Sequence, residues 1–381
     1  MTFVPAQFRA VQASALVAAV ERTFDFASAE YHSLQQRSRA NAFHAGRWLA
    51  ALQANVATAF GAEPATITVR DKADGRLLLV LALVLRHRMG VRFLEFADFG
   101  LCDYLGSVYD PSETPLLASD ATLPQRIAAA LPAHDVIAFT KLTGDDPLLG
   151  RLFPDMWRAR MRISAYPVKL CGCWPEWRTT VLGKTLRKKL DYQRRRLSKL
   201  GPLVFGEVPD SKEIVQAFNA LRRFRADRFE QIGAHDATAD DSIFAFYRNA
   251  AVEGARSGLA RTCCLYLSGE PVAVAFGLVH QRTFALILLA FDVGRFKKNS
   301  LGLLATEDTI RVSLEAGETI HDFTIGDHPY KQQFGAEEVP LYEWHHARTV
   351  RGHLAILCLA LVREAKRALK PRLTRGRHAR R

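Results

Sequence analysis

Residues Phe284–Gly335 read FALILLAFDVGRFKKNSLGLLATEDTIRVSLEAGETIHDFTIGDHPYKQQFG, and this stretch decides the fold. The nearly unbroken apolar run Phe284–Phe291 predicts a strand buried on both faces. A basic turn, Gly294–Gly302, follows it directly. Thr319–Ile325 predicts a second strand, which ends at a polar turn. Two buried strands joined by a helix-length segment indicate an α/β fold with a crossover connection.

The segment between these strands predicts a helix that begins at the basic turn. Ser300 is a favourable N-cap residue, apolar residues then recur at helical spacing, and Gly317 is a favourable stop. Such a turn can hold a phosphate, because backbone N–H groups and the helix dipole face the anion and lysines add charge. An ordinary crossover with solvated lysines explains the same residues. The turn is too short for a Walker A loop, and no G-x-G-x-x-G motif is present.

The stretch resembles the GNAT acetyltransferase superfamily, whose acyl-CoA turn has the form Q/R-x-x-G-x-G/A. The corresponding residues here are Lys297-Lys298-Asn299-Ser300-Leu301-Gly302. Lys297 stands in place of Gln/Arg, and Ser300 stands in place of the first Gly. The larger block resembles the CelD/BcsL-type acetyltransferases associated with cellulose biosynthesis, which carry a Ser-Pro-Gly-like turn, a helix and a DF..G...YK..F segment. This chain has, in order, Ser300-Leu301-Gly302, Asp322-Phe323, Gly326, Tyr330-Lys331 and Phe334. Leu301 stands where that branch usually has Pro.

The resemblance implies acetyl-CoA, or another acyl-CoA, as co-substrate and no metal. The pantetheine arm would lie along the first strand as far as Phe291, and the pyrophosphate turn would comprise Lys298, Asn299, Ser300, Leu301, Gly302 and Leu303. Direct acyl transfer needs a donor to the thioester carbonyl, a base for the nucleophile and an acid for the thiolate. It needs no covalent enzyme intermediate, in keeping with the lack of a nucleophile elbow or Cys/His signature in the sequence.

Three residues after the second strand are candidates for this chemistry. By resemblance, Tyr330 takes the place of a tyrosine that serves the departing thiolate; the alternative is a packing tyrosine. Asp327 could accept a proton, orient the acceptor or cap a helix, and Lys331 could bind an anion or lie on the surface. Arg225 and Arg228, one turn apart on a predicted helix, could face the acceptor or solvent. The sequence leaves the general base open among Glu230, His235 and Asp236.

Charge is unevenly distributed along the chain, which has 381 residues and a formal net charge of +13. Thr185–Gly201 has seven Lys or Arg and one Asp, and Arg363–Arg381 has nine and one Glu. The rest is close to neutral, which argues against a broad nucleic-acid-binding face. The first basic segment predicts a helix whose cations are solvated or contact a polyanion. The spacing of the six cysteines does not fit a zinc knuckle, and we expect reduced thiols.

The predicted elements form two helix-flanked mixed sheets, so we expect an α/β fold with two GNAT-like halves in tandem. The expected domains are an N-terminal half (1–175), an acyl-CoA-binding domain (176–348) and a basic helix and tail (349–381). Helical spacing predicts helices at Val11–Phe26 and Phe43–Phe60. The resemblance of the first half depends on Trp48, the turn at Asp74-Gly75 and the segment Asp98–Tyr104.

The function implied by the resemblance is acyl-CoA-dependent N- or O-acetyl transfer to a sugar or an exopolysaccharide precursor. One alternative is a transferase of the FemAB type, which shares the paired architecture and uses charged tRNA. Another is a GNAT scaffold that docks on an anionic membrane or a synthase complex through its basic C-terminal segment. No signal peptide is evident, and the apolar runs fall far short of the ~20 residues that span a bilayer. We therefore expect a cytoplasmic protein, either free in the cytoplasm or peripheral to the inner membrane.

Overall fold

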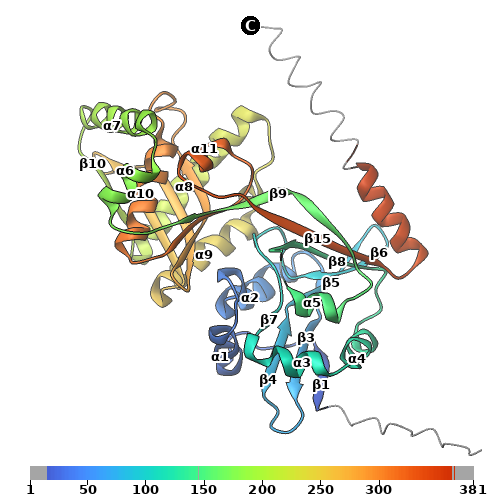
Figure 1. The fold of residues 1–381 in the computed structure, drawn as a ribbon. Coiled ribbons are helices and arrows are strands. Elements are labelled where there is room, and N and C mark those ends of the chain that lie inside the picture. Colours follow the sequence, from blue (N-terminus) through green and yellow to red (C-terminus); the bar gives the residue numbers. More distant parts are fainter. Residues whose placement is uncertain (1–14, 145, 363, 365–381) are drawn as a thin grey trace, which may run out of the picture.

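The computed structural model describes residues 15–144, 146–362 and 364. Two lobes share one 11-stranded sheet with the order β10-β11-β12-β13-β14-β9-β15-β8-β6-β5-β2 (Figure 1). The prediction of an α/β fold with two mixed-sheet halves is confirmed.

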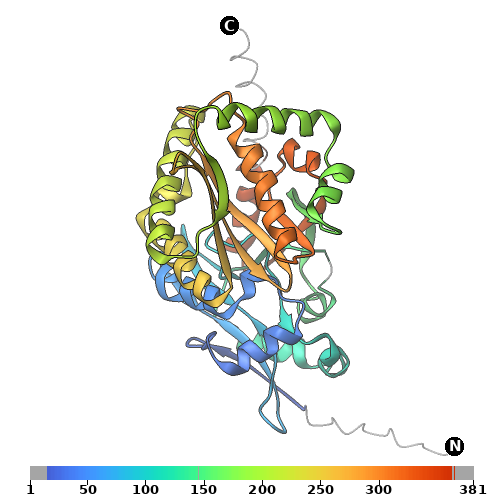
Figure 2. The ribbon, with the colours of Figure 1, turned by 90° about the vertical axis from the view of Figure 1, so that its left-hand side faces the viewer.

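The C-terminal lobe contains the stretch that decides the fold. Its strands are β10 (Leu203–Glu207), β11 (Ala260–Leu267), β12 (Glu270–His280), β13 (Thr283–Phe291) and β14 (Ile320–Ile325). Its helices are α6 (Trp174–Val181), α7 (Lys184–Ser198), α8 (Ser211–Ile232), α9 (Asp241–Ser257), α10 (Leu301–Glu315) and α11 (Pro329–Gln333). Helices α8 and α9 cover one face of the sheet, and α6, α7 and α10 cover the other (Figure 2).

Alternation along the strands produces these two packed layers. Successive residues of a strand point to opposite faces, so Cys264 packs with the α8–α9 layer and Cys263 with the α7–α10 layer. Leu186, Leu190 and Leu197 of α7 are buried, whereas Leu200 is 63% exposed. The basic helix therefore binds the lobe through an apolar stripe.

Strands β9 (Trp157–Lys169) and β15 (Val339–Ala347) join the lobes. Strand β9 pairs with β14 on one side and β15 on the other, and β15 also pairs with β8. The chain thus returns to the N-terminal lobe after completing the C-terminal one. A strand that the sequence places in the second domain lies between two strands of the first.

The N-terminal lobe divides its strands between two sheets. The shared sheet contains β2 (Ala62–Pro64), β5 (Leu83–Arg88), β6 (Val91–Phe96) and β8 (Val136–Leu142). A separate four-stranded sheet contains β1 (Leu16–Glu21), β3 (Thr66–Asp71), β4 (Leu77–Leu81) and β7 (Val108–Tyr109). The helices are α1 (Ala29–Arg37), α2 (Gly46–Leu52), α3 (Thr114–Ser119), α4 (Leu123–Ala130) and α5 (Pro147–Leu152).

The helix predicted at Val11–Phe26 is wrong in its described part. Leu16–Glu21 is strand β1, paired in register with β3. A short apolar run is compatible with both the helical and the strand period, and here pairing with β3 overrides the local helical spacing. The segment Phe43–Phe60 is largely helical, with α2 followed by a π-helical turn at Gln53–Ala57.

A helix over 350–362 follows β15 directly. The basic tail expected beyond it lies outside the described residues, apart from Glu364. Within the described ranges no helix combines the length and apolarity needed to cross a membrane.

Candidate functional site

The site is organised by an opening between two parallel strands. Strands β13 and β14 pair only at Thr283–Ala285 with Ile320–Asp322. Immediately afterwards, the register of β13 with β12 shifts so that Leu286 opposes Gly277 and Leu288 opposes Phe276. Ile287 is therefore an extra residue, and such a β-bulge bends its strand. The bulge carries β13 away from β14 and leaves the edge of its last residues open.

Gly277 allows the two strands to approach closely at the bulge. A Cβ atom there would lie 2.3 Å from the Ala285 carbonyl oxygen and within 2.7 Å of the Phe284 ring. No side chain fits such a space. The local sequence thus permits the bulge at this one point.

The turn after β13 is held by charged side chains. Asp292 accepts hydrogen bonds from the Arg295 backbone N–H (2.9 Å) and from its Nε (2.6 Å). Arg295 also donates to Glu270 at 2.8 Å. These contacts fix the path of the chain into α10.

Ser300 precedes α10 in the left-handed conformation, with φ 51° and ψ 36°. The predicted N-cap position is correct, but the side chain makes no capping hydrogen bond. This conformation strains residues other than glycine, and Ser300 stands where the GNAT turn has its first Gly. The N–H groups of Leu301 and Gly302 belong to the first helical turn, where backbone donors lack intrahelical acceptors. An anion at this end of α10 would be favoured by these donors and by the helix dipole.

Helix α7 brings further cations beside the turn. Gln193 Nε2 donates to the Lys298 carbonyl oxygen at 3.2 Å. Lys189 and Arg196 are exposed and lie four residues before and three after Gln193, on the same side of the helix. The turn itself adds the exposed Lys297 and Lys298. The entrance to α10 is therefore strongly cationic.

The inner cations of α7 have a structural role. Arg194 binds Glu307 (2.9 Å) and Asp308 (3.1 Å), two α10 carboxylates that are 1% and 2% exposed. Arg178 of α6 binds Glu307 at 2.7 Å and Asp191 at 2.6 Å. Burial lowers the pKa of Arg194, but the Asp308 and Glu307 carboxylates outweigh that effect and raise it. These ion pairs hold α6 and α7 against α10, which neither sequence interpretation of the basic helix anticipated.

Four of the residues predicted for the site come together beside the opening. A Cβ atom on Gly302 would lie 2.6 Å from the Phe291 ring, so this glycine makes room for Phe291. The Arg228 guanidinium lies 5.4 Å from the centroid of the same ring. Tyr330 stacks with His328 at 6.0 Å, and the Arg228 charge acts on both. The turn, the end of β13, α8 and α11 thus meet.

The environment of Tyr330 suits a proton donor. Burial raises the pKa of its hydroxyl, and the opposing effect of Arg228 is smaller. The phenol is therefore protonated at neutral pH. Its ring also packs against Phe323, with centroids 6.1 Å apart. The packing expected of Tyr330 is therefore observed, and its role toward a departing thiolate stays a prediction.

Lys331 lies inside the protein, 3% exposed, so the surface interpretation is wrong. Its Nζ donates to the carbonyl oxygens of Phe323 (2.9 Å), Thr324 (3.3 Å) and Ile325 (2.9 Å), which satisfies the end of β14. Burial lowers the pKa of Lys331 to about 8, although the carboxylates around it act to raise that pKa.

Asp327 accepts hydrogen bonds from the Tyr166 hydroxyl (3.0 Å) and the Ser164 N–H (3.2 Å).

Asp327 does not cap α11 and Arg225 is not solvated, so two of the expectations from the sequence are wrong. The residue at the cap of α11 is His328, so Asp327 instead ties the loop to β9. Arg225 binds the buried Asp236 at 2.6 Å and the Thr238 hydroxyl at 3.0 Å, which closes the loop after α8. Among the three candidates for the general base, Asp236 is therefore bound to Arg225, while Glu230 and His235 are exposed.

A segment of the N-terminal lobe reaches the same opening and was missed as a source of site residues. Asp103 and Tyr104 come from the segment Asp98–Tyr104. Burial raises the pKa of Asp103 to about 6, although Lys141 and the Thr324 hydroxyl oppose it. The Thr324 hydroxyl also donates to the Leu286 carbonyl oxygen (3.2 Å), at the point where β13 and β14 part. A cluster of Asp and Tyr in a predicted loop was the available signal.

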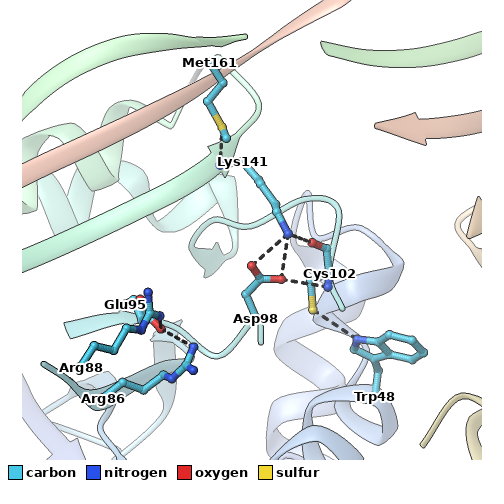
Figure 3. A network of polar contacts seen from close by, with 8 residues as sticks. All are labelled: Trp48, Arg86, Arg88, Glu95, Asp98, Cys102, Lys141 and Met161. Atoms are coloured by element: carbon cyan, nitrogen blue, oxygen red, sulfur yellow. Dashed lines mark hydrogen bonds and ion pairs between the residues drawn. The ribbon is translucent and has the colours of Figure 1, made fainter. Parts of the chain in front are cut away.

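The base of that segment is fixed by an ion pair (Figure 3). Lys141 Nζ donates to both Asp98 carboxylate oxygens, at 3.0 and 2.9 Å, and to the Cys102 carbonyl oxygen at 2.6 Å. The Trp48 indole donates to Cys102 Sγ at 3.3 Å. Two features on which the resemblance of the first half depended, Trp48 and the segment, therefore pack together. Over the described residues, no group of three or more His, Cys, Asp or Glu is placed to hold a metal ion.

Comparison with protein families gives a match over this region. The family model described as "Acetyltransferase (GNAT) domain" matches residues 184–332. No curated protein matches the chain. The C-terminal lobe therefore carries a GNAT-type fold, as predicted.

Solved structures resemble the chain over most of its length. The crystal structure of FemX aligns with a TM-score of 0.53 at 13% identity, covering 78% of this chain and 90% of FemX. L-PGS from Bacillus licheniformis aligns with a TM-score of 0.53 at 12% identity, covering 88% and 96%. A Bacteroides thetaiotaomicron protein of unknown function aligns with a TM-score of 0.53 at 11% identity, covering 87% and 100%. At these identities the likeness concerns the fold, and it extends across both lobes.

Proposed function

We propose that the protein is an acyl-CoA-dependent acyltransferase whose donor site lies in the C-terminal lobe. The observation that carries the proposal is the bulged β13, opening away from β14 and leading into a cationic turn with a left-handed Ser300. The pantetheine arm would pair with the free edge of β13, and the pyrophosphate would rest on the Leu301 and Gly302 N–H groups. Lys298, Asn299 and Leu303 complete the turn. The family match over 184–332 supports this assignment.

The proposed transfer is direct. The acceptor nitrogen or oxygen attacks the thioester carbonyl carbon, the C–S bond breaks, and the Tyr330 hydroxyl gives its proton to the leaving sulfur. The proton lost by the acceptor passes to Asp103, which is ionised at neutral pH, and solvent returns both groups to their starting state. Arg228, beside Phe291, would meet the acceptor or the acyl group. Lys331 and Asp327 act by holding the loop that carries Tyr330.

For the acceptor we propose a sugar or an exopolysaccharide precursor. This proposal is supported by the CelD/BcsL-type segment from Asp322 to Phe334. In the structure its residues pack together, with Phe323 6.2 Å from Phe334 and Lys331 capping β14. The segment thus shapes the wall of the opening on which an acceptor would lie.

The decisive test is release of free CoA thiol from acetyl-CoA in the presence of amino sugars and nucleotide sugars. Tyr330→Phe should lower kcat at least tenfold with acetyl-CoA binding retained, because only the proton donor is lost. Lys72→Ala, an exposed lysine of the N-terminal lobe, serves as a control for Lys298→Ala, which should weaken acetyl-CoA binding. A protein that does not bind acetyl-CoA but binds charged tRNA would overturn the proposal. That result would favour the FemAB-type alternative, which the likeness to FemX keeps open.

A further inference from the structure

The terminal helix over 350–362 exposes apolar side chains along most of its length. Val350, Leu354, Leu357 and Leu361 are between 55% and 77% exposed. Their spacing of four, three and four residues aligns them in one stripe. Leu359 and Val362 are also exposed, at 42% and 51%. Contiguous apolar surface of this kind marks an interaction site.

The helix is firmly anchored at its first turn. Asp135 accepts from the Thr349 hydroxyl at 2.9 Å, and its backbone oxygen accepts from the Arg348 N–H at 2.9 Å. Arg92 binds the same carboxylate at 3.2 Å. A Cβ atom on Gly352 would lie 2.2 Å from the Asp135 oxygen, so the helix begins pressed against the end of β8. The exposed stripe therefore belongs to an ordered helix.

A groove of about 1050 Å³ runs between this helix and the sheet of the N-terminal lobe. Its floor is apolar, with Phe93, Phe96 and Met161 among the lining residues, and Ile356 and Ala360 face it from the helix. Arginines from two strands of the lobe, β5 and β9, also line it, namely Arg86, Arg88, Arg160 and Arg162. Each is paired with a carboxylate: Arg86 and Arg88 with Glu95, Arg160 with Glu338 and Arg162 with Glu364. Figure 1 shows the helix at the outer edge of the N-terminal lobe, away from α7 and α10.

The chain that continues from this helix is strongly basic. Residues Arg363–Arg381 contain nine Lys or Arg and a single Glu. Two copies paired through the stripe in parallel would bring these charges together, and like charges repel. An anionic lipid surface would attract them while its interface received the apolar side chains. Charge complementarity thus selects a lipid surface over a second copy.

We propose that the face formed by the 350–362 helix and the adjoining groove docks on an anionic lipid bilayer, with the helix in the plane of the interface. This inference is independent of the proposed acyl transfer. It gives the exposed apolar stripe, the apolar floor of the groove and the basic continuation one common partner. The donor site lies in the other lobe, so docking would leave it accessible to acyl-CoA.

The test is co-sedimentation of the full chain with vesicles of phosphatidylcholine and phosphatidylglycerol in equal parts, beside vesicles of phosphatidylcholine alone. Wild type should pellet with the anionic vesicles, and 0.5 M salt should weaken binding at least tenfold. Leu354→Asp with Leu361→Asp should also cost at least tenfold, because both side chains are exposed and their loss leaves the fold intact. Val204→Asp is the matched control, because Val204 of β10 is also exposed (59%), and this variant should bind as wild type.

Three outcomes would overturn the docking proposal. The first is undiminished pelleting of the Leu354/Leu361 double variant, and the second is equal binding to both kinds of vesicle. The third is a dimer in vesicle-free solution that the double variant dissociates, which would make a second copy the partner. Titration of the double variant with acetyl-CoA separates this proposal from the acyltransferase proposal, since the donor site should be unaffected.

Discussion

The two lobes contain the same parallel strand pair and use it differently. Strands β6 and β8 pair over three residues, from Phe93 with Val136 to Glu95 with Ala138. Strands β13 and β14 also pair over three residues and then part. In the N-terminal lobe the gap is closed again, because Leu105 bridges to Leu142 and Lys141 binds Asp98. In the C-terminal lobe the gap stays open and leads to the cationic turn.

The difference begins with the strand that carries the turn. Strand β13 continues past its bulge to Phe291 and delivers the chain to the N-terminus of a 15-residue helix. Strand β6 pairs with β5 without a bulge, stops at Phe96 and passes into the segment Asp98–Tyr104. One lobe therefore presents a cationic turn at the start of a helix, where we propose that an anion binds. The other has an internal ion pair and places Asp103 beside Thr324 of its neighbour. A duplicated fold need not carry a duplicated site.

Breaking the ion pair should have the largest effect. In Lys141→Met the Asp98 carboxylate loses its partner in a largely buried place, and the free energy of unfolding should fall by about 3 kcal/mol. Denaturant unfolding measures this loss. Lys169→Met removes the exposed pair with Glu337 and should cost under about 1 kcal/mol. If folded Lys141→Met loses acetyl-CoA binding, the division of roles between the lobes is wrong.

A side chain that fills the space beside Phe291 should impair the gap between β13 and β14 and leave the N-terminal lobe unaffected. In Gly302→Ala the new methyl group would meet the Phe291 ring, and acetyl-CoA affinity should fall about tenfold, equivalent to about 1.4 kcal/mol. Gly294→Ala in the same turn is the control, since its Cβ atom would have no neighbour nearer than 3.5 Å. Calorimetric titration distinguishes the two. Unchanged affinity in Gly302→Ala would remove Phe291 and the turn from the donor site.

His44 in the N-terminal lobe and His321 in the C-terminal lobe are deeply buried, and both predict acid sensitivity. Burial lowers the pKa of His44 to about 4 and that of His321 to about 3. The unfolded chain binds these protons below about pH 6.5 and the folded chain does not, so stability falls as the pH drops from there toward 4. The slope should be roughly 1 kcal/mol per pH unit for each histidine. His321→Gln should lower the slope by about the contribution of one histidine, measured as unfolding free energy against pH, and an unchanged slope would contradict the assignment.

The smallest effect concerns backbone strain at the turn. Ser300→Gly should raise the free energy of unfolding by about 0.5 kcal/mol, because glycine adopts the left-handed conformation without a Cβ clash. Met89→Gly, at φ 49° in the β5–β6 turn, should give a similar gain and is the control from the other lobe. Thermal unfolding measures both. A loss of stability in Ser300→Gly alone would show that the serine side chain supports the turn.

The sequence predicts the two strands, the turn and the helix of the C-terminal lobe, because the hydrophobic period and the terminating residues of each lie within its own segment. It does not predict which residue of β13 is extra, since every residue of that apolar run suits a strand; Gly277 on β12 was the one local sign. The burial of Lys331 depends on the carbonyl groups at the end of β14, which come together only in the folded chain. Leu16–Glu21 becomes a strand through its pairing with β3. The exposed stripe of the terminal helix could not be foreseen, because apolar runs of that length are usually buried.

We propose that only the C-terminal lobe binds acyl-CoA. Isothermal titration of the full chain with acetyl-CoA measures the number of molecules bound per chain. We expect saturable binding of one acetyl-CoA per chain, weakened by Lys298→Ala and unaffected by Lys72→Ala. Binding of two molecules per chain, or no saturable binding, would contradict it.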